Sequence, residues 1–299
     1  MRLPAAIIAV SLLFSAIAAP ATAQESVGWS NLQRQDIRLA SVAERLMVAN
    51  AGLCNATMPV TGLILHSADQ YRGNVADARF ANGSVAISSI VPHSPADRAG
   101  LQVDDALTAI SGRPVAALAA PESGNLREAA FALLADQPIG EPVTLRISRD
   151  GVERTVSLAA PAGCRSLVEI LVGDGPRARS DGRVIQMRFD FAESLTEDEM
   201  AVVLSHELAH TVLEHRRRKE EAGIDNGVFA ELGRNQRANR EAEVEADRLS
   251  AHLLANAGYD AGIVPTYWRS PAGRSLGGLL PNFVYPSQEA RARLVEREI

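Results

Sequence analysis

The segment over residues 200–219 reads MAVVLSHELAHTVLEHRRRK and places an HELAH motif, at 206–210, inside a helical pattern. Thr196 and Glu199 precede it in capping-box spacing, which favours a helix start at this point. Residues four apart on a helix are one turn apart and about 40° apart around its axis, so both imidazoles can reach one metal ion. Glu207 projects along a neighbouring line and can reach a water molecule at the metal without binding the metal itself. The segment therefore predicts a metal-binding helix.

A second helix with the same spacing of polar groups is predicted over 239–257. Glu243 and Asp247 are four apart and share one face. A zinc ion held by two histidines needs a third protein ligand and one open position for catalysis. Glu243 can supply that ligand, and Asp247 can accept the outer N–H of a ligand histidine. The spacing alone fits equally well with two acids on the solvated face of a charged helix.

Residues 59–160 show a different pattern, in which short apolar strands alternate with turn residues. Ser94 and Pro95 suit the start of a short helix that Gly100 ends, and Asn125 opens a second helix. A hairpin turn is predicted at Asp150-Gly151. The predicted strands cover 59–66, 85–91, 142–149 and 153–158, and the second helix covers 126–134.

The run SPADRAGLQVDDALTAISGRPV in this region resembles the signature of PDZ domains associated with bacterial proteases. Asp104 stands in place of the usual Gly, and Ser111 in place of the usual Asn; an Asp tolerates the left-handed backbone of that turn. The resemblance implies a groove beside the helix 126–134 that accepts an extended peptide as an added strand, with its peptide-end loop near 71–73. The alternative is a small α/β insert whose groove is filled.

The two predicted metal helices together resemble the zinc endopeptidases related to HtpX and the CAAX prenyl protease. That family combines HExxH with a later RxxExxAD, and this chain gives HELAH and REAEVEAD, with Arg240 and Ala246 in register. The resemblance covers about residues 33–54 and 165–299. It implies an α+β fold, with a mainly helical zincin (gluzincin) catalytic domain, a small β-sheet and the PDZ-like domain as an insert.

The same resemblance implies a role for each matching residue. It assigns one Zn²⁺ per chain to the ligands His206, His210 and Glu243, and it makes Glu207 the general base. Asp247 and Arg240 are expected to contact the ligand side chains and hold them in place without binding the metal themselves. Glu241 and Glu245 are the other acids considered as third ligand, although neither stands four residues before Asp247.

The chain departs from the family pattern after the second helix. Tyr285-Pro286 stands where the family has a His-Pro pair, and Arg291 follows where the family has an Arg. The Tyr285 hydroxyl can donate a hydrogen bond to an oxyanion, or it can occupy the open metal position until substrate displaces it. The third possibility is that Tyr285 only packs.

Cys54 and Cys164, the two cysteines of the chain, stand on either side of the predicted insert. An even number of cysteines suggests a disulfide in an oxidising compartment, and here it would close the base of the insert. The alternative is two buried free thiols.

The first 23 residues have the pattern of a cleavable signal peptide. Arg2 precedes an apolar run over 5–19, and Ala21-Thr22-Ala23 fits a cut after Ala23. The alternative is an uncleaved N-terminal anchor; no later segment is apolar enough to span a bilayer. The expected division is 1–23 signal peptide, 24–58 N-terminal helical segment (with a helix over 33–51), 59–160 PDZ-like domain and 161–299 metallopeptidase domain.

These expectations describe a periplasmic or secreted zinc metalloendopeptidase that acts on polypeptides, in envelope protein quality control. The net charge of −6 and the lack of a broad basic patch exclude a typical nucleic-acid binder. The basic run at 216–219 is expected in the last turns of the HELAH helix, where positive charge suits the helix dipole. The alternative function is a PDZ peptide-binding adaptor or chaperone-like protein with a silent or structural zinc site. Glu207 argues against it, because a structural zinc site needs no adjacent base.

Overall fold

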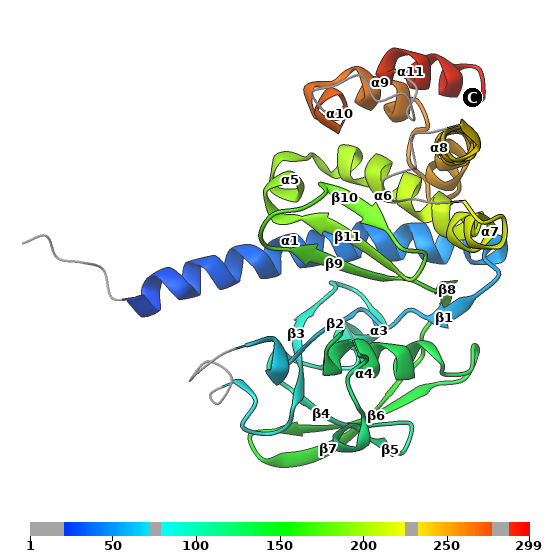
Figure 1. Ribbon diagram of the computed structural model, residues 1–299. Helices are drawn as coiled ribbons and strands as arrows, with labels where there is room; N and C mark the ends of the chain where they lie inside the picture. Colours follow the sequence, from blue (N-terminus) through cyan, green and yellow to red (C-terminus); the bar gives the residue numbers. More distant parts are fainter. Residues whose placement is uncertain (1–20, 72–78, 123, 225–232, 277–286) are drawn as a thin grey trace, which may run out of the picture.

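The computed structural model describes residues 21–71, 79–122, 124–224, 233–276 and 287–299. This part of the chain is a mixed α/β structure with two bodies, a helix-rich domain above and the PDZ-like domain below, in the view of Figure 1. The long helix α1 (Ala21–Ala49) runs along the boundary between them. It begins earlier than the predicted helix over 33–51 and passes through the predicted cleavage position after Ala23. Residues 1–20 of the predicted signal peptide lie outside the described residues.

The helix-rich domain consists of α1 and the chain that follows residue 164. Its other helices are α5 (Phe189–Ser194), α6 (Glu197–Val212), α7 (His215–Glu221), α8 (Gly233–Asn256), α9 (Ile263–Arg269), α10 (Pro271–Leu276) and α11 (Gln288–Glu296). A small sheet with the order β10-β11-β9 packs beside them, formed by β9 (Leu167–Leu171), β10 (Ala178–Ser180) and β11 (Val184–Arg188). β11 runs parallel to β9 and antiparallel to β10.

Helix α6 carries the HELAH motif through the centre of this domain. The predicted capping box forms: the Glu199 N–H donates to Thr196 Oγ1 at 3.2 Å, and the Thr196 N–H donates to Glu199 Oε2 at 3.0 Å. Every residue from Met200 to His206 is buried. α8 and α1 both pack against α6, so the motif is held between two long helices.

The end of α6 differs from the prediction. α6 stops at Val212, Glu214 adopts a left-handed backbone with φ 51°, and α7 begins at His215. The basic run 216–219 therefore lies in α7 and not in the last turns of the HELAH helix. The prediction that these charges interact with the dipole of the HELAH helix is therefore wrong. Its arginines instead form ion pairs with Glu220, Glu221, Glu214 and Glu245.

The PDZ-like domain is built on a sheet with the order β2-β3-β4-β6-β7, and β5 pairs with β4. Its strands are β2 (Leu63–Ser67), β3 (Val85–Ile90), β4 (Ala106–Ile110), β5 (Arg113–Pro114), β6 (Val143–Arg149) and β7 (Val152–Leu158). Its helices are α3 (Pro95–Arg98) and α4 (Leu126–Ala135), with short 3₁₀ turns η2 (Ala68–Gln70) and η3 (Val115–Ala117). The predicted helices and three of the four predicted strands of this region are present with shifts of one or two residues at their ends.

Local turn chemistry explains this agreement. Ser94 and Asn125 accept the hydrogen bonds that cap α3 and α4. Asp104 adopts φ 67°, as expected for a residue that replaces Gly in a left-handed turn. Asp150 and Gly151 both have positive φ, 52° and 76°, which is the geometry of the predicted hairpin turn between β6 and β7.

The predicted strand over 59–66 is two strands. β1 (Thr57–Pro59) belongs to the junction between the domains, whereas β2 is the edge strand of the PDZ-like sheet. Gly62 separates them with φ 82°, and a Cβ on it would lie 2.0 Å from Ser94 Cβ. The break therefore requires glycine at this position.

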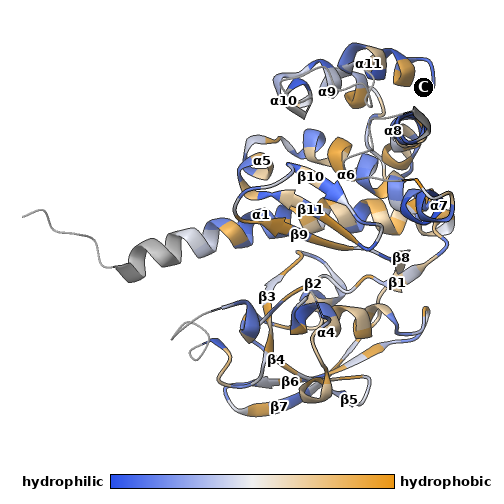
Figure 2. Cartoon of the chain, viewed as in Figure 1, coloured by the Kyte–Doolittle hydropathy of each residue, from blue (hydrophilic) through white to orange (hydrophobic). Residues whose placement is uncertain are grey.

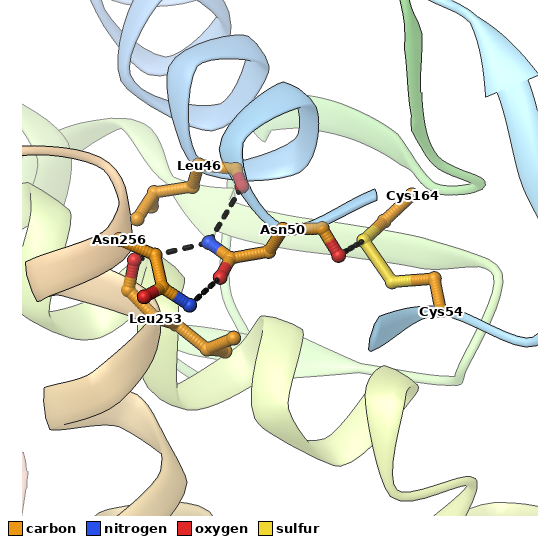
Figure 3. The surroundings of a disulfide bond; sticks show 6 residues. All are labelled: Leu46, Asn50, Cys54, Cys164, Leu253 and Asn256. Atoms are coloured by element: carbon orange, nitrogen blue, oxygen red, sulfur yellow. Dashed lines mark hydrogen bonds between the residues drawn. A yellow bond between two sulfur atoms is a disulfide. The ribbon is translucent and has the colours of Figure 1, made fainter. Parts of the chain in front are cut away.

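The junction brings the two ends of the PDZ-like domain together. β1 pairs antiparallel with β8 (Ala162–Cys164), and the predicted disulfide joins Cys54, after the turn η1 (Ala51–Leu53), to Cys164. Beside it, the buried Asn50 donates to the carbonyl oxygens of Leu46 at 2.8 Å and Leu253 at 3.0 Å (Figure 3). The disulfide thus stands next to a polar link between α1 and α8.

Each domain has its own hydrophobic core. One cluster joins α1, α5, α6, α8 and α9, and the other fills the space between the PDZ-like sheet and its helices. Figure 2 shows that β9 and β11 are largely hydrophobic, whereas α7 is largely hydrophilic. Among the described helices, none combines the length and the apolar character needed to cross a membrane.

Candidate metal centre

Three of the predicted ligands meet between α6 and α8. His206 Nε2 and His210 Nε2 lie 3.2 Å apart. The Glu243 carboxylate lies 3.3 Å from His206 Nε2 and 3.5 Å from His210 Nε2. The helical spacing of four residues on α6 aims both imidazoles at the same point, and the packing of α8 against α6 brings the carboxylate to it.

These distances fit a tetrahedral zinc site. Ligand atoms at about 2.0–2.1 Å from a tetrahedral ion lie about 3.3–3.4 Å from one another. The three observed separations fall within about 0.2 Å of that range. Two imidazole nitrogens and one carboxylate oxygen also form a donor set typical of catalytic zinc.

The electrostatics of Glu243 and His210 favour a cation at this point. Burial alone would raise the pKa of Glu243, but the neighbouring His206 and His210 outweigh it and lower the pKa to about 2. Burial lowers the pKa of His210 to about 3. Glu243 is therefore an anion and His210 a neutral imidazole, which are the forms that bind a metal ion.

Asp247 on α8 orients the imidazole of His206 through its Nδ1 atom. This Nδ1 lies 3.1 Å from Asp247 Oδ1, so Nδ1–H donates to the carboxylate. Burial alone would lower the pKa of His206, but the hydrogen bonds to Asp247 and Glu243 raise it to about 9, so a metal ion must displace the proton on Nε2. Asp247 is fully buried, and Arg291 on α11 forms a bidentate pair with it at 2.6 and 2.7 Å. The Arg291 guanidinium in turn stacks 3.5 Å above the ring of Trp268.

His210 is oriented by a different set of residues. Its Nδ1 lies 2.7 Å from Nδ1 of His215, and Nε2 of His215 lies 3.1 Å from Glu245 Oε2. For His210 to present a free Nε2, its Nδ1–H must donate to His215, and His215 must then donate Nε2–H to Glu245. The turn at Glu214 makes this contact possible, because it rotates His215 back towards the end of α6.

Glu207 lies beside the three ligands, on the line expected from the sequence. Burial raises the pKa of Glu207 to about 7, although a backbone hydrogen bond from Ser180 on β10 opposes the shift. A carboxyl group with a pKa near 7 can both accept and release a proton at neutral pH. β10 pairs only with β11 among the described strands, so its other edge is free next to α6.

A cavity of about 670 Å³ reaches this centre from the PDZ-like domain. Its lining includes His210 and Thr211 of α6 and Glu128 and Phe131 of α4. Residues 181–184, between β10 and the start of β11, also line it. The cavity is large enough for a short stretch of polypeptide.

Two predicted site residues are not part of this arrangement. Arg240 is exposed on α8, about 10 Å along the helix from Asp247, and the guanidinium that pairs with Asp247 is that of Arg291. The supporting position predicted for Arg240 is therefore wrong. Tyr285 lies outside the described residues. Glu245, one of the other acids considered as third ligand, pairs with His215 and Arg218 instead.

Sequence comparison assigns the β-rich part of the chain. Residues 86–149 match the family model described as a PDZ domain, so the chain contains a PDZ domain, as predicted. The match ends well before the HELAH helix, and no curated protein matches the chain.

Two solved structures are similar to part of the chain. The PDZ domain of HtrA3 bound to a phage-derived ligand is 20% identical, with 36% of this chain and 88% of that chain covered and a TM-score of 0.26. The HtrA-type protease AlgW with a decapeptide is 16% identical, with 36% of this chain and 30% of that chain covered and a TM-score of 0.27.

Proposed function

We propose that the chain is a zinc-dependent endopeptidase in which His206, His210 and Glu243 bind one Zn²⁺. The observation that carries the proposal is the convergence of two imidazole nitrogens 3.2 Å apart on one carboxylate, whose Oε2 lies 3.3 Å from His206 Nε2 and whose Oε1 lies 3.5 Å from His210 Nε2. Sites that serve only structure are closed by four protein ligands, whereas only these three come together among the described residues, which leaves the fourth position for water or substrate.

The residues of the chain have separate tasks in peptide hydrolysis. Bound zinc supplies Lewis-acid polarisation of a carbonyl and eases the deprotonation of water. Glu207 takes the proton of the attacking water and then delivers it to the amine that leaves. Asp247 and His215 hold the two imidazoles in the tautomer and orientation that the site requires.

The PDZ domain gives this activity a polypeptide partner. PDZ domains bind extended peptides along a sheet edge, so the domain would hold a protein substrate near the cavity that joins α4 to His210. The disulfide supports export to an oxidising compartment, in line with the predicted signal peptide. A role in envelope protein quality control fits these features.

The test compares the purified mature protein with Glu207→Gln, with zinc content measured for both. We expect the variant to keep stoichiometric zinc and to lose casein cleavage by a factor of about 100 or more, because an amide cannot take the proton of the water. Glu220→Gln is the matched control, since Glu220 also lines the cavity and is paired with Arg216. Substantial cleavage by Glu207→Gln would remove it from the role of base.

The second candidate is a PDZ peptide-binding adaptor or chaperone-like protein with a silent or structural zinc site. The family match favours it, because the matched residues belong to the PDZ domain and not to the metal centre. Bound zinc and peptide binding without cleavage of any tested protein would support this function over the first.

A further inference from the structure

Trp268 on α9 lies between two parts of the candidate metal centre. The residue is only 3% exposed, and its ring packs against His206 in a T-shaped arrangement, with ring centroids 6.2 Å apart. The guanidinium of Arg291 lies over the same indole, 3.5 Å from the ring centroid. One side chain of α9 therefore contacts both a candidate zinc ligand and the arginine that pairs with Asp247.

The carboxylate of Asp247 joins these two neighbours of the indole. Its Oδ1 lies 3.1 Å from Nδ1 of His206 and 2.6 Å from Nη2 of Arg291, so both donate to the same oxygen. Arg291 Nε donates to the other oxygen at 2.7 Å. Because a bidentate pair fixes the plane of a carboxylate, the position of the guanidinium determines the direction from which Oδ1 holds the imidazole.

Arg291 is also close to another candidate ligand. Its Nη2 lies 3.9 Å from Glu243 Oε2, which is longer than either hydrogen bond to Asp247. A guanidinium that moved towards Glu243 would pair with a carboxylate that the metal needs, and would compete with the ion. The site therefore requires that Arg291 stay on the side of Asp247.

The indole of Trp268 supplies a surface that holds the guanidinium there. Trp attracts a cation over its ring face more strongly than Tyr or Phe does, and the attraction increases when water is excluded. Arg291 is only 6% exposed, so its contact with the ring is shielded from water. Tyr267 packs on the indole with ring centroids 5.1 Å apart, which restricts the movement of the ring.

The indole nitrogen takes no part in this arrangement. Nε1 of Trp268 is buried and has no hydrogen-bond partner in the part of the chain that the structure describes. A buried donor without a partner costs stability, and Phe at this position would avoid the cost. The structure thus uses the ring face of the indole and not its N–H.

We infer that Trp268 is a positioning residue of the metal centre, which holds Arg291 against Asp247 and so keeps His206 directed at the ion. The inference rests on the zinc site of the proposed function. It gives a role to α9, which lies outside the two helices that carry the metal-binding motifs.

The test measures the Zn²⁺ affinity of the full mature chain by competition with a chromophoric chelator. We expect Trp268→Leu, which is apolar but has no ring face, to bind zinc about tenfold more weakly than wild type. Trp268→Phe keeps a ring face and should stay within about threefold of wild type. The visible absorption of the Co²⁺-loaded protein depends on ligand geometry, so it should change in Trp268→Leu and persist in Trp268→Phe.

The matched control is Trp29→Leu, which also removes an indole stacked with an arginine. Arg79 lies 4.4 Å from the Trp29 ring centroid, at the PDZ domain, and we expect this variant to bind zinc as wild type does. Circular dichroism and the thermal midpoint check that each variant is folded, and Trp268→Met replaces Trp268→Leu if the latter does not fold.

A double variant tests whether Trp268 acts through Asp247. In an Asp247→Asn background we expect Trp268→Leu to cause no further loss of zinc affinity, because the connection from Arg291 to His206 is already broken. An additive loss would assign Trp268 to packing and overturn the inference.

The remaining outcomes separate the inference from the proposed function. Equal zinc affinity of wild type and Trp268→Leu overturns the inference while the zinc site stands. Equal losses in Trp268→Phe and Trp268→Leu overturn it as well, because the ring face would then have no part in the effect. A wild-type chain that binds no zinc overturns the inference together with the zinc-dependent function.

Discussion

The Nδ1 atoms of His210 and His215 lie 2.7 Å apart, and only one of the two nitrogens can carry the proton between them. For Nε2 of His210 to bind a metal ion beside Glu243, its proton must be on Nδ1, and the acceptor must then be His215. Glu245 completes the series at 3.1 Å from His215 Nε2. The orientation of one candidate zinc ligand therefore depends on a residue beyond the end of the HELAH helix.

Replacement of His215 should weaken zinc binding without removing a ligand. His215→Ala takes away the acceptor for His210, so the imidazole loses its fixed orientation, and we expect zinc affinity to fall by about 10- to 100-fold. Competition with a chromophoric chelator measures this affinity. His252→Ala is the control, because His252 pairs with Glu298 at the exposed end of α8. An unchanged zinc affinity in His215→Ala would assign His215 to packing alone.

Loss of Arg291 should destabilise the fold more than loss of its neighbour Arg293. Arg291→Ala leaves the Asp247 carboxylate buried without its bidentate partner, and we expect a cost of about 3–5 kcal/mol in the free energy of unfolding. Arg293→Ala removes an exposed pair with Glu289 on the same helix, which contributes less than about 1 kcal/mol. Urea unfolding of the metal-free proteins measures both values. Similar costs for the two variants would contradict the structural role of Arg291.

The bond between Cys54 and Cys164 should be present in protein from an oxidising compartment. Mass spectrometry of unreduced peptides should find the two cysteines linked, and two alkylatable thiols would contradict the structure. The double variant Cys54→Ala, Cys164→Ala should lose up to about 4–5 kcal/mol of stability, because the bond closes a long loop in the unfolded chain. It should still fold, since β1 and β8 remain paired.

Asp36 should make stability depend on pH in the acidic range. Burial raises the pKa of Asp36 from 3.8 to about 6, although the Ile170 N–H opposes the shift. The folded state thus binds more protons than the unfolded state between these values. The contribution of the protonated Asp36 carboxyl to the stability of the fold is complete below about pH 4. It is lost as the pH rises through about 6.

The Asp36→Asn variant tests this dependence. It should be more stable than wild type at about pH 8, by at most about 3 kcal/mol, and the difference should vanish towards pH 4. Urea midpoints of the metal-free proteins across this range provide the measurement, with Glu193→Gln as an exposed control. A constant difference across the range would show that Asp36 titrates in its ordinary range.

The sequence predicted those features that depend on neighbouring residues. The capping box of Thr196 and Glu199, the caps at Ser94 and Asn125, and the turn at Asp150 require only side chains within a few positions. The pairing of Cys54 with Cys164 was predictable because the two ends of an inserted domain must lie close together. The spacing in HELAH likewise predicts that two imidazoles converge on one face of a helix.

The parts that the sequence did not predict depend on tertiary contacts. Nothing in residues 211–219 marks a helix break, because Glu214 is neither Gly nor Pro, yet its left-handed backbone is what brings His215 to His210. Arg240 matched a motif, but Arg291, which is 44 residues from Asp247 in sequence, forms the contact. The ion pair between Arg127 and Glu169 depends on how two domains pack, and no local pattern encodes that packing.

The disulfide at the base of the PDZ domain also determines how the chain responds to mechanical force. Cys54 and Cys164 are 110 residues apart in sequence but only 5.4 Å apart between their Cα atoms. A force applied between α1 and α11 is therefore carried across the sulfur bridge and bypasses the PDZ domain. Once the bond is reduced, separation of β1 from β8 and unfolding of the PDZ domain under force would release roughly 360–400 Å of contour length. The PDZ domain therefore carries no load while the disulfide is intact, and it can be extended by force only after the disulfide is reduced.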